Sequence, residues 1–405
     1  MPVKDTAREA TIAAIRAARI EVTRACRDIE TDSGKAERLN ELLAGHGFEV
    51  SSGVAGIADA SRADRKHLDR AAMRNGLRHG HIAYLVDLDS PTSLGSATVL
   101  AAAIGCGVAL ESEHGLVTVI TYPGDAALLA IANAGVFDEF DAVFGARPAE
   151  TGAGFAYTIN STGDTLASRS ADITVERDAT AFLAQLEAET AQHDAPSRID
   201  GSIEDGFVRL TLTARTSVEL RDLSAIVQRL AAETPGASVS FGNPTDDMLV
   251  SRILARRVKT YADTLGYTFE QVAKLDPEPA TGWGNVSQVT PAFRLSFPFT
   301  TDQVVNGDPA FAAAAARSTS YDRALEFGEC LGLAGLDALR DMQFRAIADD
   351  QLIKALAARG VNRQHRRWLG VHPVIKDTNE KANGKKKGPR LADFRMVRGP
   401  GMRDN

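Results

Sequence analysis

The sequence is poor in cysteine and aromatic residues and has no long apolar run, and each shortage argues against a class of protein. Its three cysteines, Cys26, Cys106 and Cys330, cannot build a disulfide framework or a zinc site made of thiolates. No apolar stretch reaches the roughly 18 residues that a membrane-spanning helix needs. The first 29 residues alternate alanine with charged side chains and lack the apolar core of a signal peptide. We therefore predict a cytoplasmic protein that does not enter a membrane.

The formal net charge of −7 over 405 residues conceals an uneven distribution. From Arg359 to Asn405 there are 13 lysines and arginines against four acidic residues, so this segment carries +9 and the rest of the chain −16. Residues 370–405 lack the apolar side chains of a folded unit, and their one aromatic residue, Phe394, argues against nucleic-acid binding. We predict a basic tail that docks on the acidic body of its own chain or of a second copy.

Helical and strand patterns alternate along the first part of the chain. Continuous apolar runs predict buried strands at 81–89 and 116–122. Helices are predicted around these strands at 4–29, 34–45, 97–104 and 126–134. Such alternation is typical of an α/β fold in which helices cover both faces of a mostly parallel sheet.

The pattern changes near residue 165 and changes back near residue 245. Strands of period two at 208–213 and 237–241 alternate with helices at 176–192 and 217–233, which predicts a small α+β domain with one solvated sheet face. Further helices are predicted at 309–317, 320–339 and 345–358. The resulting domain prediction is a discontinuous main domain at 1–168 and 245–369, an inserted α+β domain at 169–244, and a basic C-terminal tail at 370–405.

Three carboxylates stand at the carboxyl ends of predicted strands, where open α/β sheets bind their ligands. Asp87 and Asp89 end the first buried strand, and Asp125 follows the second. An alternating strand places Asp87 and Asp89 on opposite faces, so at most one of them faces a given cleft. The structural alternatives are helix capping or arginine pairing for Asp87 and Asp89, and turn formation after Pro-Gly for Asp125.

Five short segments occur in the order found in one enzyme family. They read GFEV, GVAG, DLD, AGVFDEFDA and GNVS, at 47–50, 53–56, 87–89, 134–142 and 284–287, and Pro291 follows the last. Together they resemble the zinc amidohydrolases and dipeptidases of the aminoacylase, aminobenzoyl-glutamate hydrolase and beta-alanyl dipeptidase type, peptidase family M20. The resemblance extends to about residue 358. It implies a zinc-peptidase-like α/β main domain with an inserted α+β lid, through which such proteins usually form homodimers.

The sequence departs from the resemblance at the positions that hold or serve the metal. No ligand-bearing loop follows the DLD segment, and Pro123-Gly124-Asp125-Ala126 stands where the family has two glutamates. Histidines expected at 147, near 307 and in 165–170 are absent, and none of the eight histidines matches a ligand position. We therefore predict no two-zinc site and no cofactor. A hard cation held by Asp87, Asp89 and Asp125 is the alternative.

Two arginines are predicted to contact a substrate. Arg147 replaces a metal-binding histidine, and its fixed charge could neutralise Asp125 or Asp89 or hold a ligand carboxylate in two hydrogen bonds. A structural ion pair is an equal alternative. Arg215 matches a family arginine that resembles a binder of the substrate carboxylate, although the neighbouring family segment is missing here.

Four further residues complete the predicted substrate site. Asn285 and Ser287 lie in the GNVS segment, interpreted as a turn, and would either hydrogen-bond a ligand or hold the turn itself. Trp283 would stack on a ligand or pack in the core. Asp87 would line the same cleft.

Two functions remain open from the sequence. The first is a diverged amidohydrolase-fold enzyme that acts without zinc on a small amino-acid-like, N-acyl or peptide amide, with Asp125 and Asp89 as acid and base. The second is a catalytically inactive pseudo-peptidase that serves as a dimeric binding or scaffold protein.

Overall fold

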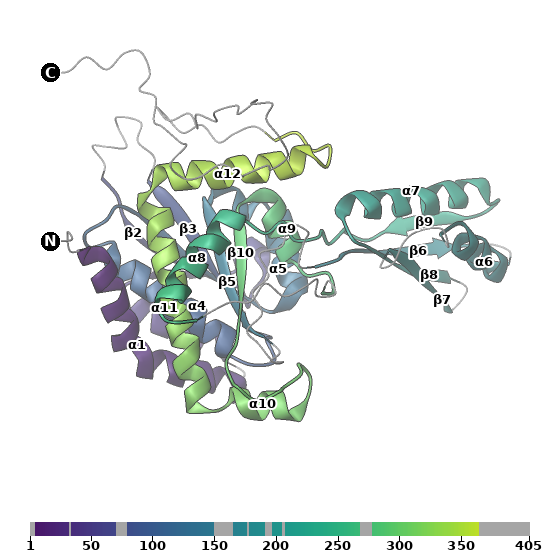
Figure 1. Ribbon diagram of the computed structural model, residues 1–405. Helices are drawn as coiled ribbons and strands as arrows, with labels where there is room; N and C mark the ends of the chain where they lie inside the picture. Colours follow the sequence, from purple (N-terminus) through teal and green to yellow (C-terminus); the bar gives the residue numbers. More distant parts are fainter. Residues whose placement is uncertain are drawn as a thin grey trace, which may run out of the picture.

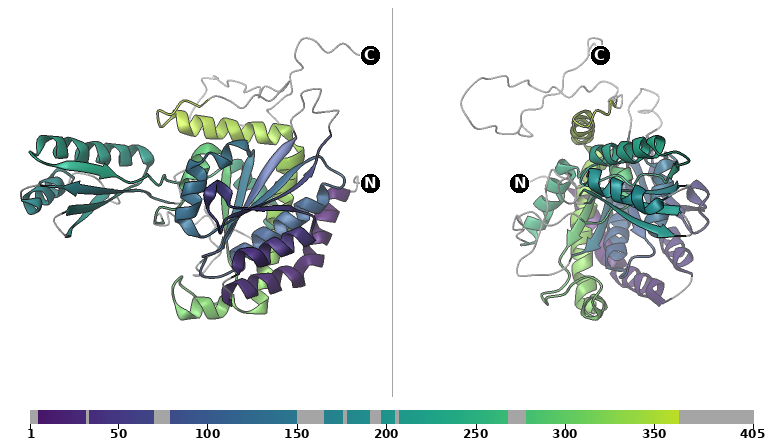
Figure 2. Two further views of the ribbon diagram at one scale, coloured as in Figure 1. Left: turned by 180° about the vertical axis from the view of Figure 1, so that it is seen from behind. Right: turned by 90° about the vertical axis from the view of Figure 1, so that its right-hand side faces the viewer.

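The computed structural model describes residues 5–31, 34–69, 79–149, 165–175, 178–190, 197–204, 207–267 and 278–363. Within them, the chain forms a larger main domain and a smaller second domain, each with its own sheet and core (Figure 1). The second domain projects from one side of the main domain, as the view from behind also shows (Figure 2, left). The predicted basic tail at 370–405 lies outside the described residues.

The main domain is built on a six-stranded sheet in the order β1-β2-β4-β3-β5-β10. The four strands from β4 to β10 run parallel, whereas β1 and β2 are antiparallel to their neighbours. The mostly parallel sheet and the α/β class are as predicted. The strands are β1 (Glu49–Ser52), β2 (Ser61–His67), β3 (Gly80–Asp87), β4 (Gly115–Tyr122), β5 (Ala142–Pro148) and β10 (Ala292–Phe297).

Helices cover both faces of this sheet. The first face carries α1 (Thr6–Thr31), α2 (Lys35–Gly45), α4 (Leu94–Ala109), α8 (Arg252–Thr264), α10 (Pro309–Ala315) and α11 (Ser318–Arg340). The second carries η1 (Val54–Gly56), α5 (Gly124–Asn133), η2 (Val136–Glu139) and α9 (Trp283–Val289). Helix α12 (Met342–Ala357) crosses the end of the sheet at which β3 begins (Figure 1). No helix of the described ranges is both long and apolar enough to cross a membrane.

Helix α4 is the centre of the core. All of its residues except Val108 are buried, because the sheet covers one side and α1 and α11 cover the other. Its small side chains allow this close approach: a Cβ at Gly105 would lie 2.7 Å from the Ile15 side chain. Glycine and alanine in a buried helix therefore reflect tight helix packing here.

The second domain has a four-stranded antiparallel sheet in the order β7-β8-β6-β9, with two helices on one face. Its elements are β6 (Ala167–Thr174), α6 (Ala179–Thr190), β7 (Arg198–Glu204), β8 (Phe207–Ala214), α7 (Ser217–Glu233) and β9 (Ser238–Phe241). The helix predicted at 217–233 has these bounds in the structure. The domain limits at residues 169 and 244 stay a prediction.

The sequence reasoning missed several elements and mistook one. Strands β2, β5, β6 and β7 and helix α8 were not expected, because polar residues or glycine interrupt their apolar patterns. The predicted turn at Gly284–Ser287 is wrong: these residues lie inside helix α9. A helix is possible there because Gly284 packs on the backbone of Asp246, where a Cβ would lie only 1.6 Å from the carbonyl oxygen.

A buried ion pair joins the two domains. The Asp247 carboxylate, which has no exposed side-chain surface, accepts hydrogen bonds of 2.7 Å from both Nη1 and Nη2 of Arg359. The same carboxylate accepts bonds from the backbone N–H and hydroxyl of Ser217, at the start of α7. Asp247 therefore connects the first turn of the second domain's long helix to the end of α12.

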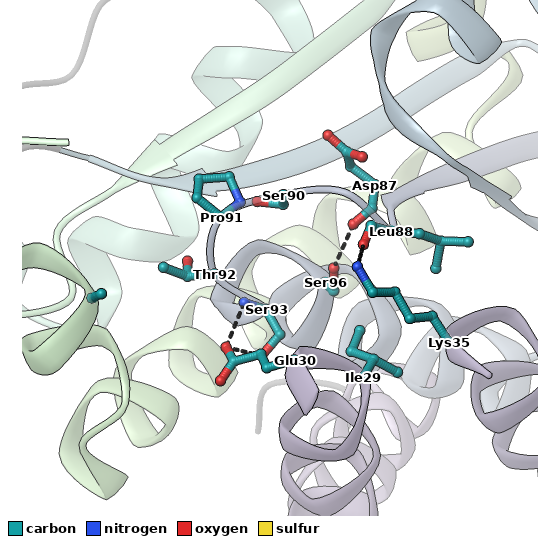
Figure 3. A pocket seen from close by; sticks show the side chains of 11 residues that line it. Ile29, Glu30, Lys35, Asp87, Leu88, Ser90, Pro91, Thr92, Ser93 and Ser96 are labelled. Atoms are coloured by element: carbon teal, nitrogen blue, oxygen red, sulfur yellow. Dashed lines mark hydrogen bonds between the residues drawn. The ribbon is translucent and has the colours of Figure 1, made fainter. Parts of the chain in front are cut away.

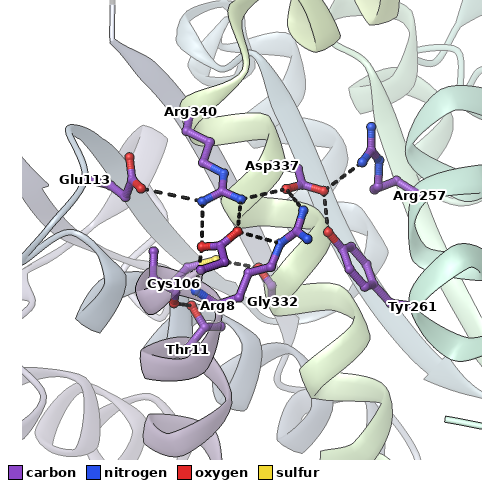
Figure 4. Close-up of polar contacts among 11 residues, drawn as sticks. Arg8, Thr11, Cys106, Glu113, Arg257, Tyr261, Gly332, Asp337 and Arg340 are labelled. Carbon is purple, nitrogen blue, oxygen red and sulfur yellow. Dashed lines mark hydrogen bonds and ion pairs between the residues drawn. The ribbon is translucent and has the colours of Figure 1, made fainter. Parts of the chain in front are cut away.

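A second buried carboxylate holds three helices of the main domain together (Figure 4). Asp337 of α11 accepts hydrogen bonds of 3.0 Å from Arg8 of α1 and from Arg257 of α8, and it also accepts one from the Tyr261 hydroxyl. Arg340 lies 3.7 Å from it and pairs with Asp5. Because its side chain is only 6% exposed, Asp337 depends on these cations for its charge.

Asp337→Ala should destabilise the protein strongly, since it leaves three guanidiniums facing one another in a partly buried space. We expect a loss of about 3–5 kcal/mol in the free energy of unfolding, measured by urea denaturation. The control is Asp322→Ala on the same helix, which removes an exposed ion pair with Arg19 and should cost about 1 kcal/mol or less. Equal losses in the two variants would contradict this account.

Candidate functional site

The sheet order creates a crevice between β3 and β5. After β3 the chain passes through α4 to β4, on one side of β3. After β4 it passes through α5 to β5, on the other side of β3, so the two connections run in opposite directions across the sheet. Ligands of open α/β sheets bind at such points. A cavity of about 260 Å³ lies there, and its lining includes Asp87, Ser90, Gly95, Ser96, Tyr122, Asp125, Arg147, Glu278, Thr281, Trp283 and Arg294. We call it the switch-point cavity.

Two aspartates, Asp87 and Asp125, form one end of this cavity. Asp87 ends β3 and accepts hydrogen bonds from the backbone N–H groups of Asp89 (3.0 Å) and Gly124 (3.3 Å). Burial raises the pKa of Asp87, and the charges of Asp125 and Asp89 raise it further, while the two N–H groups oppose the shift. Asp125, in the first turn of α5, accepts a hydrogen bond of 3.2 Å from the N–H of Gly282.

Asp89 lies outside the switch-point cavity. Strand β3 ends at Asp87, so the expected alternation of faces does not reach Asp89, which lies in the turn that follows. Its carboxylate is half-exposed and lies 3.7 Å from Nζ of Lys35, in a hollow beside Pro123. The structure therefore pairs Asp125 with Asp87, and not with Asp89.

An ion-pair bridge also lines the cavity. Arg147, at the end of β5, pairs with Glu278, and Arg294 of β10 donates a hydrogen bond of 3.2 Å to the same carboxylate. The partner expected for Arg147 was Asp125 or Asp89, and this expectation is wrong. Sequence reasoning missed Glu278 and Arg294. Arg294 could have been predicted, because it is the lone arginine in the apolar strand AFRLSF.

Trp283 forms a wall of the cavity. It is only 2% exposed, and its indole N–H donates a hydrogen bond of 3.2 Å to the hydroxyl of Tyr122. The ring packs on Gly145 of β5, where a Cβ would lie 2.2 Å from it. The Arg294 guanidinium lies 5.9 Å from the ring centre. Trp283 thus packs in the core and also borders the cavity.

Asn285 and Ser287 are occupied by the protein's own backbone. Asn285 accepts a hydrogen bond from the N–H of Asp246 and donates one to the carbonyl of Pro244. The Ser287 hydroxyl is fully buried, donates to the carbonyl of Gly284 and accepts from the N–H of Leu249. Neither residue lines the switch-point cavity; both hold the 244–249 segment against α9.

Arg215 also lies apart from the switch-point cavity. It follows β8 in the second domain, and its N–H donates a hydrogen bond of 3.2 Å to Glu219. Its side chain is not among those that line the cavity beside Arg147. The structure therefore does not bring the two predicted carboxylate-binding arginines together.

A smaller hollow of about 160 Å³ adjoins the switch-point cavity and shares Asp87, Ser90, Pro91 and Ser96 with it (Figure 3). Here Glu30 of α1 accepts hydrogen bonds from the N–H and the hydroxyl of Ser93, immediately before α4. A protein carboxylate therefore occupies the amino end of α4, which favours negative charge.

The side chains present do not fit a dinuclear metal centre. Among the described residues, no three His, Cys, Asp or Glu side chains are grouped so that they could hold a metal ion, and this includes the three aspartates considered for a hard cation. His67, His79, His81 and His114 lie at the end of the sheet where β3 begins, roughly 20 Å from Asp87 along the strand.

The three cysteines are buried, as free thiols. Burial raises the pKa of the Cys106 thiol to about 12, and its sulfur donates a hydrogen bond to the carbonyl of Gly332. A thiol that stays protonated is a poor nucleophile. None of the three lines the switch-point cavity.

Comparison with known proteins identifies the fold. No family model and no curated protein matches the sequence. A solved structure from methicillin-resistant Staphylococcus aureus, assigned as an aminohydrolase, matches 82% of this chain and all of its own, with a TM-score of 0.60 and 12% identity. An aminobenzoyl-glutamate utilization protein from Klebsiella pneumoniae matches 80% of this chain and 97% of its own (TM-score 0.52, 13% identity).

A third match names the family. A dinuclear metal-binding peptidase of the M20 family, from Bacillus subtilis, matches 77% of this chain and 98% of its own, with a TM-score of 0.50 and 14% identity. The chain therefore has the fold of the M20 peptidases and related amidohydrolases, as the sequence motifs predicted. The side chains that would hold a dinuclear centre are missing from the described part of that fold.

The lack of grouped metal-binding side chains among the described residues leads to a prediction about metal content. We expect the purified full-length chain to contain far less than one zinc ion per molecule, because a structural or catalytic zinc site needs about three protein ligands. Inductively coupled plasma mass spectrometry, after dialysis against metal-free buffer, measures this directly. A content near two zinc ions per chain would overturn our description of the site.

Proposed function

We propose that the chain is a diverged amidohydrolase that cleaves an amide bond of a small amino-acid-like molecule in the switch-point cavity without a dinuclear metal centre. The observation that carries this proposal is the pair formed by Asp87 and Asp125 at one end of the cavity. Two neighbouring carboxylates in unequal environments supply an acid and a base at the same pH.

The two aspartates have different roles in this proposal. Asp87, whose pKa is raised by burial and by Asp125, stays protonated to a higher pH and donates a proton to the leaving nitrogen. Asp125, at the more exposed position, removes a proton from the attacking water. The water oxygen forms the bond to the acyl carbon as the carbon–nitrogen bond breaks, so the products are a carboxylic acid and an amine.

The ion-pair bridge that lines the same cavity supports the choice of substrate. Arg147 and Arg294 share the single carboxylate of Glu278, so these three groups carry a net positive charge. A substrate carboxylate of the kind found in N-acyl amino acids and dipeptides would lie there, beside the wall formed by Trp283. The aminobenzoyl-glutamate utilization protein that shares the fold suggests this class of substrate.

Asp125→Asn and Asp87→Asn should each lower kcat by about 100-fold or more, since general acid or base catalysis contributes about 10²–10⁴-fold. The assay follows amine release from a panel of N-acetyl amino acids and dipeptides. In the wild type, the rate should fall as the pH rises through the raised pKa of Asp87, because only the protonated form donates.

The control for these variants is Asp89→Asn, two residues further along the chain and outside the cavity. It should retain activity within about twofold. An equal loss in Asp89→Asn and Asp125→Asn would contradict the assignment of Asp87 and Asp125 as the reacting pair.

The second candidate function is a binding protein without catalysis. The absence of a metal-binding group of side chains among the described residues favours it, because the M20 peptidase named above binds a dinuclear metal. Compounds of the same panel that raise the melting temperature, with no amine released by the wild type, would establish this alternative in place of the enzyme.

We also propose a homodimer through the second domain, and a cytoplasmic location in keeping with three free thiols. Strand β7 lies at the edge of its sheet, and Ile203 and Phe207 at its hairpin are 43% and 45% exposed. Unpaired strand edges with apolar side chains associate readily.

Phe207→Glu should therefore convert the dimer to a monomer, since it places a charge on this apolar edge. Light scattering should report twice 43.1 kDa for the wild type and 43.1 kDa for the variant. Leu265→Glu is the control, because Leu265 is similarly exposed at the end of α8 in the main domain. A monomeric wild type would refute the dimer.

A further inference from the structure

A second cavity, of about 290 Å³, lies where the two domains meet. Its walls come from β6 and α7 of the second domain and from α9 and the end of α12 in the main domain. It shares no residue with the switch-point cavity. We call it the junction cavity, and the function proposed above does not use it.

Two arginines in the junction cavity have no carboxylate partner among the described residues. Arg169 of β6 donates a hydrogen bond of 2.8 Å to the carbonyl of Gly242, and its guanidinium lies 4.3 Å from the centre of the Phe241 ring. Arg221 of α7 donates one of 3.1 Å to the carbonyl of Arg359. Both guanidiniums keep further N–H donors beside the cavity.

The charge of the other lining residues does not cancel these arginines. Arg359 is neutralised by Asp247, as described above. The remaining lining carboxylate, Asp246, is partly buried beside Asp247. Even with both aspartates ionised, Arg169, Arg221 and Arg359 outnumber them by three charges to two, so the cavity keeps a net positive charge.

The rest of the wall is partly apolar. Val218 and Leu220 of α7 and Leu356 and Val361 of the main domain are among the lining residues. Val361 is 39% exposed, so part of this apolar surface is open to solvent. A ligand that matches both features has one anionic group and a short apolar chain.

We propose that the junction cavity binds a small amphipathic carboxylate, with its anionic group held by Arg169 and Arg221 and its apolar chain packed against Leu356 and Val361. Guanidiniums bind carboxylates through charge-assisted hydrogen bonds, which are the strong class in proteins. Because the two arginines belong to the second domain and the apolar pair to the main domain, the bound molecule contacts both domains at once.

Octanoate titrated into the full-length chain by isothermal calorimetry tests the proposal. We expect one site per chain, and Arg169→Gln and Arg221→Gln should each weaken binding by about tenfold, since each removes a charge-assisted contact. Octanol should bind at least about tenfold more weakly than octanoate for the same reason. Arg252→Gln, an exposed arginine on α8 outside both cavities, is the matched control and should leave binding unchanged.

The Arg147→Gln variant distinguishes octanoate binding in the junction cavity from binding in the switch-point cavity. If Arg147→Gln binds octanoate as the wild type does, the ligand lies in the junction cavity. If Arg147→Gln loses octanoate binding while Arg221→Gln retains it, the ligand lies in the switch-point cavity, and the proposal is overturned. Absence of octanoate binding to the wild type, or equal binding of octanol, overturns it as well. Circular dichroism confirms that each variant is folded.

Discussion

The close packing of α4 between the sheet, α1 and α11 is the constraint on which the rest of the structure depends. A glycine on one side of each helix contact allows the close approach: Gly105 of α4 meets Ile15 of α1, and Gly328 of α11 meets the carbonyl of Thr98 in α4. Gly95, at the start of the helix, lies against β5, where a Cβ would be 2.4 Å from the carbonyl oxygen of Ala146. The helix therefore begins directly beside the end of β5.

Elements that carry their own periodic pattern were predicted from the sequence, and elements that depend on contacts with other segments were not. The buried strands β3 and β4 and the amphipathic helix α7 carry their own periodic patterns, so they were predicted closely. Strand β2, SRADRKH, has no apolar run, because its charged side chains pair across the sheet surface and towards solvent. Helix α9 contains a glycine and an asparagine, and it forms because the 244–249 segment supplies its tertiary contacts.

The candidate site was only partly predictable, for a related reason. Strand ends located Asp87 and Asp125 at one crevice, because topology alone determines that position, whereas Asp89, placed in the same way, lies outside the cavity. Arg147 was found through the resemblance, since its strand β5 was not predicted. The ion-pair partners of these residues were not predicted, because they belong to distant segments that no local pattern connects. Glu278, for example, lies far along the chain from β5 and forms ion pairs with Arg147 and Arg294. For the same reason Asn285, Ser287 and Arg215, which were carried over from a resemblance in short motifs, have other contacts in this chain.

Helix α9 connects the two cavities physically. Trp283, at its first residue, borders the switch-point cavity, and Gln288, near its last, borders the junction cavity. Gln288 also donates a hydrogen bond to the carbonyl of Asp247, whose carboxylate holds Ser217 and Arg359. A movement of the second domain would have to break this buried arrangement or carry α9 with it. Because Gly145 leaves the indole ring of Trp283 no free space above β5, such a displacement of α9 would change the wall of the switch-point cavity.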